Sequence, residues 1–148
     1  MMNNQENIET NNQTQKLAAP SKYFDLWNEV KKVIHTDSRR CLYHEREIWW
    51  CYLGINIGHE EDGKGMQSTR PVMIVKGFSR EMCLTVPLTT STKMSPYHVS
   101  IGFLGGKMSY AIASQVRLID SKRLITRLGY ADKASYEFTK KAIRDVLG

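Results

Sequence analysis

Two short apolar runs near the middle of the chain give the clearest structural signal in the sequence. Residues 72–75 and 82–88 are rich in Val, Ile, Leu and Met, and a polar break, Ser79-Arg80-Glu81, separates them. Runs of this length are too short for typical helices and indicate buried β-strands. We therefore predict two antiparallel strands that are joined by a tight turn.

The position of the turn decides which residues meet at the open end of this hairpin. If the turn is centred between the first two residues of the break, positions whose numbers sum to 159 lie opposite each other, and Arg70 faces Thr89. A bulge at Gly77 would shift the pairing by one and bring Thr90 opposite instead. In either register a guanidinium and a hydroxyl meet at one end of the sheet, where they are suited to binding a phosphate.

Further short strands are predicted around this hairpin. They cover residues 46–53, 97–103, 107–113 and 125–130, with Leu104-Gly105-Gly106 as a second hairpin turn, and residues 115–120 lead into a helical turn at 121–123. Pro87 requires a sheet edge, a bulge or a strand end. The long loop at 54–68 contains an acidic trio, Glu60-Glu61-Asp62, and a loop of this length in a small domain is typical of a functional segment.

Two amphipathic helices are expected outside the strands. Ser21 caps the first, which runs to about His35 with Tyr23, Trp27, Val30 and Ile34 on one face. Asp132 caps the second, at 133–147, with Phe138, Ala142, Ile143 and Val146 turned inward. The first helix either docks on the main domain, covers a groove or extends a dimer interface.

These elements predict an α+β fold that is mainly antiparallel β: a small barrel with a C-terminal helix and an added N-terminal helix. We expect a disordered tail at 1–20, a helix and linker at 21–44, and the barrel at 45–148. The N-terminus lacks a signal-peptide pattern and no run is long enough to span a membrane, so we expect a cytoplasmic protein without membrane contact. Three cysteines without Cys-x-x-Cys spacing indicate free thiols.

Charge and residue types narrow the chemistry only slightly. The net charge of +6 suggests an anionic partner, either nucleic acid or an acidic protein segment. The chain carries no phosphate-binding glycine motif, nucleophile elbow or zinc-ligand spacing, and its four histidines (His35, His44, His59, His98) are scattered. On spacing alone, Arg70 also fits a solvated strand-start charge, and the hydroxyls at 89–92 also fit turn residues.

Four segments, taken in order, resemble the MazF/PemK family of bacterial toxins, which cut single-stranded RNA. They are REIWWCYLGINIGHEEDGKG, TRPVMIVKGF, LTVPLTTSTK and SQVRLIDSKRLITRLGYADKASYEFTKKAIRDVL. They correspond to the family's first strand and loop, its Arg-Pro strand start, its strand ending in a Thr/Ser cluster, and its Gln-x-Arg segment with the last helix. The resemblance covers residues 45–148, about 104 of the 148 residues.

The resemblance implies an SH3-like barrel that forms a homodimer with an RNA groove across the subunit interface. It also implies cleavage without a metal or cofactor, by attack of the ribose 2′-hydroxyl on the adjacent phosphate. Arg70 would stabilise charge on the phosphate, Thr89 matches the family's catalytic threonine, and His59 would supply a base or an acid. The expected RNA contacts are Glu60, Lys64, Gln67, Thr90, Ser91, Lys93, Gln115 and Arg117. The expected partner is a small antitoxin with an acidic, flexible tail.

The sequence departs from one branch of the family, which uses an Arg and an Asp just before the Gln-x-Arg segment. Ile112 and Ser114 stand at those positions here. The loop between Gly58 and Gln67 is also a few residues longer than usual. Two alternatives therefore stay open: a gyrase-poisoning toxin of the same fold, and a non-catalytic module that binds RNA or protein.

Overall fold

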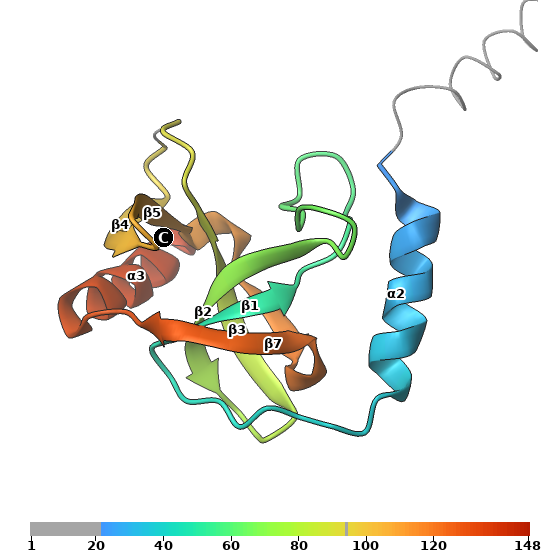
Figure 1. The fold of residues 1–148 in the computed structure, drawn as a ribbon. Coiled ribbons are helices and arrows are strands. Elements are labelled where there is room, and N and C mark those ends of the chain that lie inside the picture. The colour runs from blue at the N-terminus through green and yellow to red at the C-terminus, as the bar shows by residue number, and fades with distance from the viewer. Residues whose placement is uncertain (1–21, 94) are drawn as a thin grey trace, which may run out of the picture.

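The computed structural model describes residues 22–93 and 95–148, and in them a curled antiparallel sheet is flanked by two α-helices (Figure 1). The strands are β1 (Glu47–Tyr52), β2 (Thr69–Gly77), β3 (Met82–Thr89), β4 (His98–Leu104), β5 (Lys107–Ile112), β6 (Arg117–Asp120) and β7 (Leu124–Tyr130). The helices are α2 (Phe24–Thr36) and α3 (Lys133–Val146), with 3-10 turns η1 (Ala113–Gln115) and η2 (Ser121–Arg123). No helix in the described residues is long and apolar enough to cross a membrane.

Among the described residues, the strand order gives a curled sheet whose end strands, β4 and β7, do not pair with each other. Neighbouring strands run β4-β5-β3-β2-β1-β7, and β6 pairs with β3 beside β5. All of these pairings are antiparallel. This curled sheet with a C-terminal and an N-terminal helix confirms the predicted fold class.

The curl gives the central strands two buried faces, which explains their nearly continuous apolar runs. One core lies beneath α3 and contains Ile48, Met73, Val75, Val86, Leu88, Ile101, Ala111, Ala131 and Tyr136. The other lies on the opposite face and contains Trp49, Cys51, Leu53, Val72, Ile74, Cys83, Ile119 and Leu124. Consecutive residues of a strand point to opposite faces, so Ile48 and Trp49 enter different cores. Burying each large aliphatic side chain stabilises the fold by roughly 1.5–3 kcal/mol.

The central hairpin has the predicted register at its open end. Val72 pairs with Pro87 and Met73 with Val86, so the pair numbers sum to 159, and the same register places Arg70 and Thr89 at the end of the sheet. The predicted alternative, a bulge at Gly77 that brings Thr90 opposite, is wrong. The irregularity lies between Ile74 and Lys76, nearer the turn, and shifts only the pairs beyond it.

Pro87 occupies a position where β3 changes its partner. Residues 82–85 of β3 pair with β6, whereas residues 88–89 pair with β5. Pro87 lies between these two stretches and is buried. The missing N–H therefore falls where the ladder on that side of β3 is interrupted, so the fold tolerates a proline inside a strand.

The remaining predicted elements are present with small changes at their ends. β4 and β5 form the second hairpin, and its two turn residues, Gly105 and Gly106, have φ of +58° and +80°, which glycine adopts without strain. The helical turn at 121–123 is η2, and the last strand is β7.

Helix α3 begins at its predicted cap but turns a different face inward. The Asp132 carboxylate accepts a hydrogen bond from the Ser135 N–H at 2.8 Å. Tyr136 and Thr139 are buried, and the Tyr136 hydroxyl donates to the Val75 carbonyl at 2.7 Å. The predicted inward position of Phe138 is wrong, because this side chain is 65% exposed. Phe138 is rotated about 200° from Tyr136 around the helix axis, and the tyrosine is anchored on β2.

Helix α2 docks through fewer residues than predicted. Trp27 is buried, and Val30 and Ile34 of the predicted face are half-buried. Tyr23 is 79% exposed, so its predicted inward position is wrong. With φ −78° and ψ 63°, Tyr23 precedes the first helical residue and does not follow the helical period. The predicted cap Ser21 and the predicted tail at 1–20 lie outside the described residues.

The three cysteines differ in accessibility, which predicts a labelling pattern. Cys51 and Cys83 are buried, and burial raises the pKa of each thiol to about 12, whereas Cys41 in the linker is only half-buried. Because the thiolate is the reactive form, we expect a maleimide to label Cys41 alone in the native protein, at pH 7 and at pH 9. Mass spectrometry should find no native label in Cys41→Ser. Labelling of Cys51 or Cys83 without denaturant would contradict the packing of the second core.

Candidate active site

Arg70 lies at the start of β2 with its guanidinium buried and fully engaged. The residue is 7% exposed, and Pro71 after it favours an extended backbone at Arg70. Its Nε donates to the Asp62 carbonyl at 2.7 Å, its Nη1 donates to the Leu88 carbonyl at 3.0 Å, and its Nη2 lies 2.6 Å from the Glu61 carboxylate. The arginine therefore joins β2, β3 and the β1–β2 loop (residues 53–68).

Thr89 ends β3 on the same side of the sheet. Its hydroxyl oxygen accepts a hydrogen bond from the Ser91 N–H at 3.1 Å, which leaves the O–H free to donate. A groove of about 680 Å³ is lined by Arg70, Thr89, Thr90 and Lys64. The structure thus brings together four of the residues that the sequence singled out.

The wall of this groove is largely apolar. Trp50 and Leu128 line it, each 38% exposed, and Leu104 lines it from the β4–β5 hairpin. These apolar side chains lower the local dielectric constant around the Arg70 guanidinium and the two threonine hydroxyls. Electrostatic contacts are stronger there than in open water.

The β1–β2 loop is held in shape by its own backbone. Gly54 and Ser68 are joined by an N–H to carbonyl bond of 3.0 Å, and the Gly63 N–H donates to the Gly54 carbonyl at 2.8 Å. A Cβ at Gly63 would lie 1.8 Å from the Ser68 carbonyl oxygen, so only glycine fits this approach. The glycines that the sequence displays in this loop thus allow a close fold that brings Glu61 and Asp62 to Arg70.

Three other residues that were predicted to contact RNA lie around a second, smaller hollow of about 320 Å³. Its lining includes Glu60, Glu61, Gln115 and Arg117. The Gln115 amide accepts from the Glu61 N–H and donates to the His59 carbonyl, both at 3.2 Å. Arg117 donates to the Leu53 carbonyl at 3.2 Å. In this structure these side chains hold the loop backbone.

The remaining predicted residues lie at the surface. His59 is exposed on the loop and does not line the groove with Arg70. Gln67, Ser91 and Lys93 are exposed and line neither hollow. The described residues hold no group of three or more His, Cys, Asp or Glu side chains arranged to bind a metal ion.

Sequence reasoning missed the role of Glu61 and Asp62. Both stand in the acidic trio of the loop, but no spacing rule places a loop carboxylate on a particular arginine. The available signal was charge: an acidic trio in a glycine-rich loop directly precedes the strand that begins with Arg70. At the two positions where one branch of the family has an Arg and an Asp, Ile112 is buried and Ser114 is exposed, so neither supplies an ionisable group.

The curled sheet and its C-terminal helix define a small SH3-like barrel, with the arginine–threonine corner in a groove at one end of the sheet. A family model described as PemK-like, MazF-like toxin of type II toxin-antitoxin system matches residues 44–147. The chain therefore belongs to this toxin family, as the resemblance predicted.

Solved structures of the family share the fold at low sequence identity. MazF from Deinococcus radiodurans has a TM-score of 0.59 and 20% identity, over 73% of this chain and 98% of that chain. An endoribonuclease from a Mycobacterial species, solved with its cognate antitoxin, has a TM-score of 0.54 and 21% identity, over 72% and 95%. Mycobacterium tuberculosis toxin MazF-mt6 has a TM-score of 0.54 and 17% identity, over 69% and 96%. No curated protein sequence matches the chain.

The Glu61–Arg70 ion pair predicts how the site responds to a free oxyanion. In Glu61→Gln the buried guanidinium loses its only carboxylate partner within 4 Å among the described residues, so an external anion meets less competition. We expect inorganic phosphate to bind about tenfold more tightly than to the wild type, since bonds to charged groups contribute roughly 1.5–3 kcal/mol. The thermal unfolding midpoint, measured against phosphate concentration, reports this affinity.

Glu60→Gln is the matched control, because the Glu60 carboxylate accepts from the Ile57 N–H at 2.8 Å and makes no ion pair with Arg70. An equal phosphate response in both variants would contradict the role of the Glu61 ion pair.

Proposed function

We propose that this toxin is a sequence-selective, metal-independent endoribonuclease that cleaves single-stranded RNA. The observation that carries the proposal is the meeting of the Arg70 guanidinium and the Thr89 hydroxyl in one groove of a chain that belongs to the MazF-like toxins. An endoribonuclease and several MazF toxins share its fold. The net charge of +6 favours an anionic substrate.

In the proposed reaction the ribose 2′-oxygen forms a bond to the adjacent phosphorus while the bond from phosphorus to the 5′-oxygen breaks. A base removes the proton of the 2′-hydroxyl and an acid delivers one to the leaving 5′-oxygen. The products are a 2′,3′-cyclic phosphate and a 5′-hydroxyl. RNA is cut and DNA is not, because only RNA carries the attacking hydroxyl.

Arg70 is suited to the charge that develops on the phosphate. Its Nε and Nη1 are fixed on the carbonyls of Asp62 and Leu88, and its Nη2 is paired with Glu61. A phosphate oxygen would take the place of the Glu61 carboxylate at Nη2. The guanidinium is already oriented by its other two bonds, so little reorganisation is needed when the charge develops.

Thr89 supplies a second donor to the same phosphate. Its oxygen accepts from the Ser91 N–H, so its O–H points to another acceptor, which we assign as a non-bridging phosphate oxygen. A threonine hydroxyl is too weak a base for the proton transfers. We assign one of these transfers, as the base or as the acid, to His59, a side-chain type that exchanges protons near neutral pH, and the other to solvent water. His59 reaches the groove only after the loop moves.

The RNA would extend from the groove over the flanking loops. Lys64 and Thr90 line the groove, and Gln67, Ser91 and Lys93 follow on the exposed loops at its ends. Glu60, Gln115 and Arg117 surround the second hollow, which suits a nucleotide next to the scissile bond. Their amide, carboxylate and guanidinium groups can read base edges, in keeping with cleavage that depends on sequence.

A homodimer would complete this groove, because its apolar wall is open in a single chain. Trp50 and Leu128 are partly exposed next to Arg70, and exposed apolar surface at a functional groove is typical of an interface. We propose that two chains meet there.

The expected partner in the cell is a small antitoxin. A MazE–MazF complex from Deinococcus radiodurans and an endoribonuclease bound to its cognate antitoxin share the fold of this chain. An acidic, flexible tail would bind Arg70 as Glu61 does, and it would thereby keep RNA out of the groove.

Replacing the arginine tests the activity directly. We expect Arg70→Ala and Arg70→Lys to lower the cleavage rate by about 10²–10³, since lysine lacks the planar fork that fixes the phosphate. A long single-stranded RNA is incubated with protein in EDTA, and its cut ends are mapped. Discrete cuts with cyclic-phosphate and 5′-hydroxyl ends are expected from the wild type.

Arg80→Ala is the matched control, because Arg80 is exposed in the turn at the far end of the same hairpin. Wild-type cleavage by Arg70→Ala would exclude the assigned site, and cleavage that requires added Mg²⁺ would exclude the metal-independent mechanism. If the folded wild type leaves RNA intact, the proposal fails, and a supercoiling assay then tests gyrase poisoning against a non-catalytic binding role.

If the proposed dimer forms through the apolar wall of the groove, a charged side chain placed in this wall should lower the molecular mass in solution. Leu128→Glu places a carboxylate among apolar side chains and should shift the protein to a monomer in analytical ultracentrifugation. Leu118→Glu is the control, since Leu118 is 52% exposed on β6 and does not line the groove. A dimer that persists in Leu128→Glu would locate the interface elsewhere.

A further inference from the structure

Residues 22–43, which precede β1, lie outside the family match, yet Lys22 and Trp27 among them contact the loop that covers Arg70. Lys22 stands just before α2 and its Nζ reaches across to the β1–β2 loop. It donates to the Asn56 carbonyl at 2.6 Å and to the Gly58 carbonyl at 2.8 Å, and lies 2.9 Å from the Asp62 carboxylate. One ammonium group thus joins three points of the loop.

Helix α2 is seated on the beginning of the same loop. Trp27 is 6% exposed and packs on Gly54, where a Cβ would lie 2.4 Å from the indole ring. The guanidinium of Arg123 lies 5.7 Å from the centre of the ring and donates to the Tyr52 carbonyl at 3.0 Å. The tryptophan therefore fixes the helix where the chain leaves β1.

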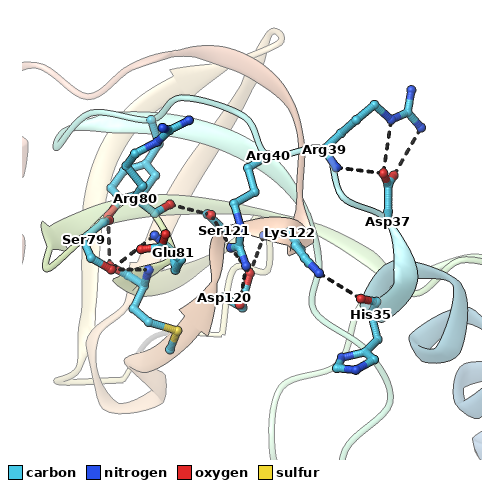
Figure 2. A network of polar contacts seen from close by, with 12 residues as sticks. His35, Asp37, Arg39, Arg40, Ser79, Arg80, Glu81, Asp120, Ser121 and Lys122 are labelled. Atoms are coloured by element: carbon cyan, nitrogen blue, oxygen red, sulfur yellow. Dashed lines mark hydrogen bonds and ion pairs between the residues drawn. The ribbon is translucent and has the colours of Figure 1, made fainter.

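The other end of α2 is tied to the barrel through η2. Figure 2 shows Lys122 reaching the His35 carbonyl, at 2.8 Å, and Arg40 of the linker reaching Asp120, at 2.5 Å. The Asp120 carboxylate also accepts from the Lys122 N–H at 2.8 Å. In Figure 1 the linker runs from the end of α2 along the barrel to β1. The helix is thus held at both ends, with the loop at its N-terminal end.

Lys22 is linked to the proposed catalytic arginine through a single residue, Asp62, which contacts both side chains. The Asp62 carboxylate binds Lys22 and accepts from the Asn56 N–H at 2.6 Å, while the Asp62 carbonyl accepts from Arg70. Glu61, the preceding residue, pairs with the remaining guanidinium nitrogen, Nη2 of Arg70. A loop conformation that satisfies Lys22 therefore also places Glu61 on Arg70.

We propose that Lys22 and α2 form an intramolecular clamp that keeps the β1–β2 loop folded over Arg70 and so lowers the affinity of the groove for single-stranded nucleic acid. Lys22 is a positioning residue, since it acts on Arg70 through Asp62. The effect on cleavage rests on the proposed endoribonuclease function, but the effect on the loop does not. A phosphate must displace Glu61, and the clamp opposes the loop movement that this displacement needs.

The test compares Lys22→Met with Lys32→Met in the full chain. Lys32 lies on α2, which follows Lys22. It pairs with the exposed Glu29 and, within the described residues, makes no hydrogen bond or ion pair with the loop, so it controls for the loss of a charge on this segment. We expect amide hydrogen exchange at residues 55–64 to become about tenfold faster in Lys22→Met, because one charged group with three acceptors is removed. Lys32→Met should exchange like the wild type.

Two functional readouts accompany the exchange measurement. A single-stranded 2′-deoxy oligonucleotide, which lacks the attacking hydroxyl, should bind Lys22→Met several-fold more tightly in fluorescence anisotropy. In RNA cleavage KM should fall by a similar factor and kcat should not fall, because Lys22 does not contact Arg70 and the loop that carries His59 moves more freely without it. Asp62→Asn should reproduce the faster exchange, and the double variant should add little to either single change.

Unchanged exchange at 55–64 in Lys22→Met would overturn the clamp. Faster exchange with unchanged or weaker oligonucleotide binding would also overturn it, because the loop would then not limit access to the groove. If the wild type leaves RNA intact, the endoribonuclease proposal fails, and exchange together with oligonucleotide binding still decides the clamp.

Discussion

A buried guanidinium needs acceptors on every side, and the architecture around Arg70 follows from this requirement. Arginine does not lose its proton inside a protein, so its charge must be paired where it stands. β3 supplies the Leu88 carbonyl, and the β1–β2 loop supplies the Asp62 carbonyl and the Glu61 carboxylate. One side chain thus joins the end of the hairpin to the loop that folds back on it.

The proposed activity requires a phosphate to compete with Glu61 for Arg70. Glu61 stabilises the free site because it neutralises the guanidinium, and it occupies the arm that a phosphate would use. The proposed RNA substrate and the proposed acidic antitoxin tail would both offer oxyanions to this nitrogen, Nη2 of Arg70, so both would compete with a carboxylate of the chain itself. The affinity of the groove for an oxyanion would therefore depend on how much more strongly Arg70 pairs with that oxyanion than with Glu61.

The sequence predicted those parts of the fold that depend on local pattern. The apolar runs and the polar break predicted a hairpin that brings Arg70 and a threonine to one sheet end, with Thr89 or Thr90 opposite the arginine. The structure has the register with Thr89, and a slip by one residue would exchange the two buried faces between the two cores. Phe138 and Tyr23 were misplaced, since the inward face of a helix is chosen by tertiary contacts such as the bond from Tyr136 to Val75. Glu61 could not be assigned, because its position depends on a loop that is shaped by distant partners.

The β1–β2 loop is held from two sides: by the barrel, and by α2 together with Lys22 just before it. From the barrel, the Gln115 amide holds the loop with neutral hydrogen bonds, and the guanidiniums of Arg70 and Arg117 donate to loop carbonyls. From α2, Lys22 holds it with a charge and Trp27 holds it by packing. The loop carries carboxylates between two cations, Lys22 and Arg70, so opening it separates charges as well as breaking hydrogen bonds. Higher ionic strength would therefore weaken the proposed clamp and the proposed RNA contacts together, whereas a partner that displaces α2 would release only the clamp.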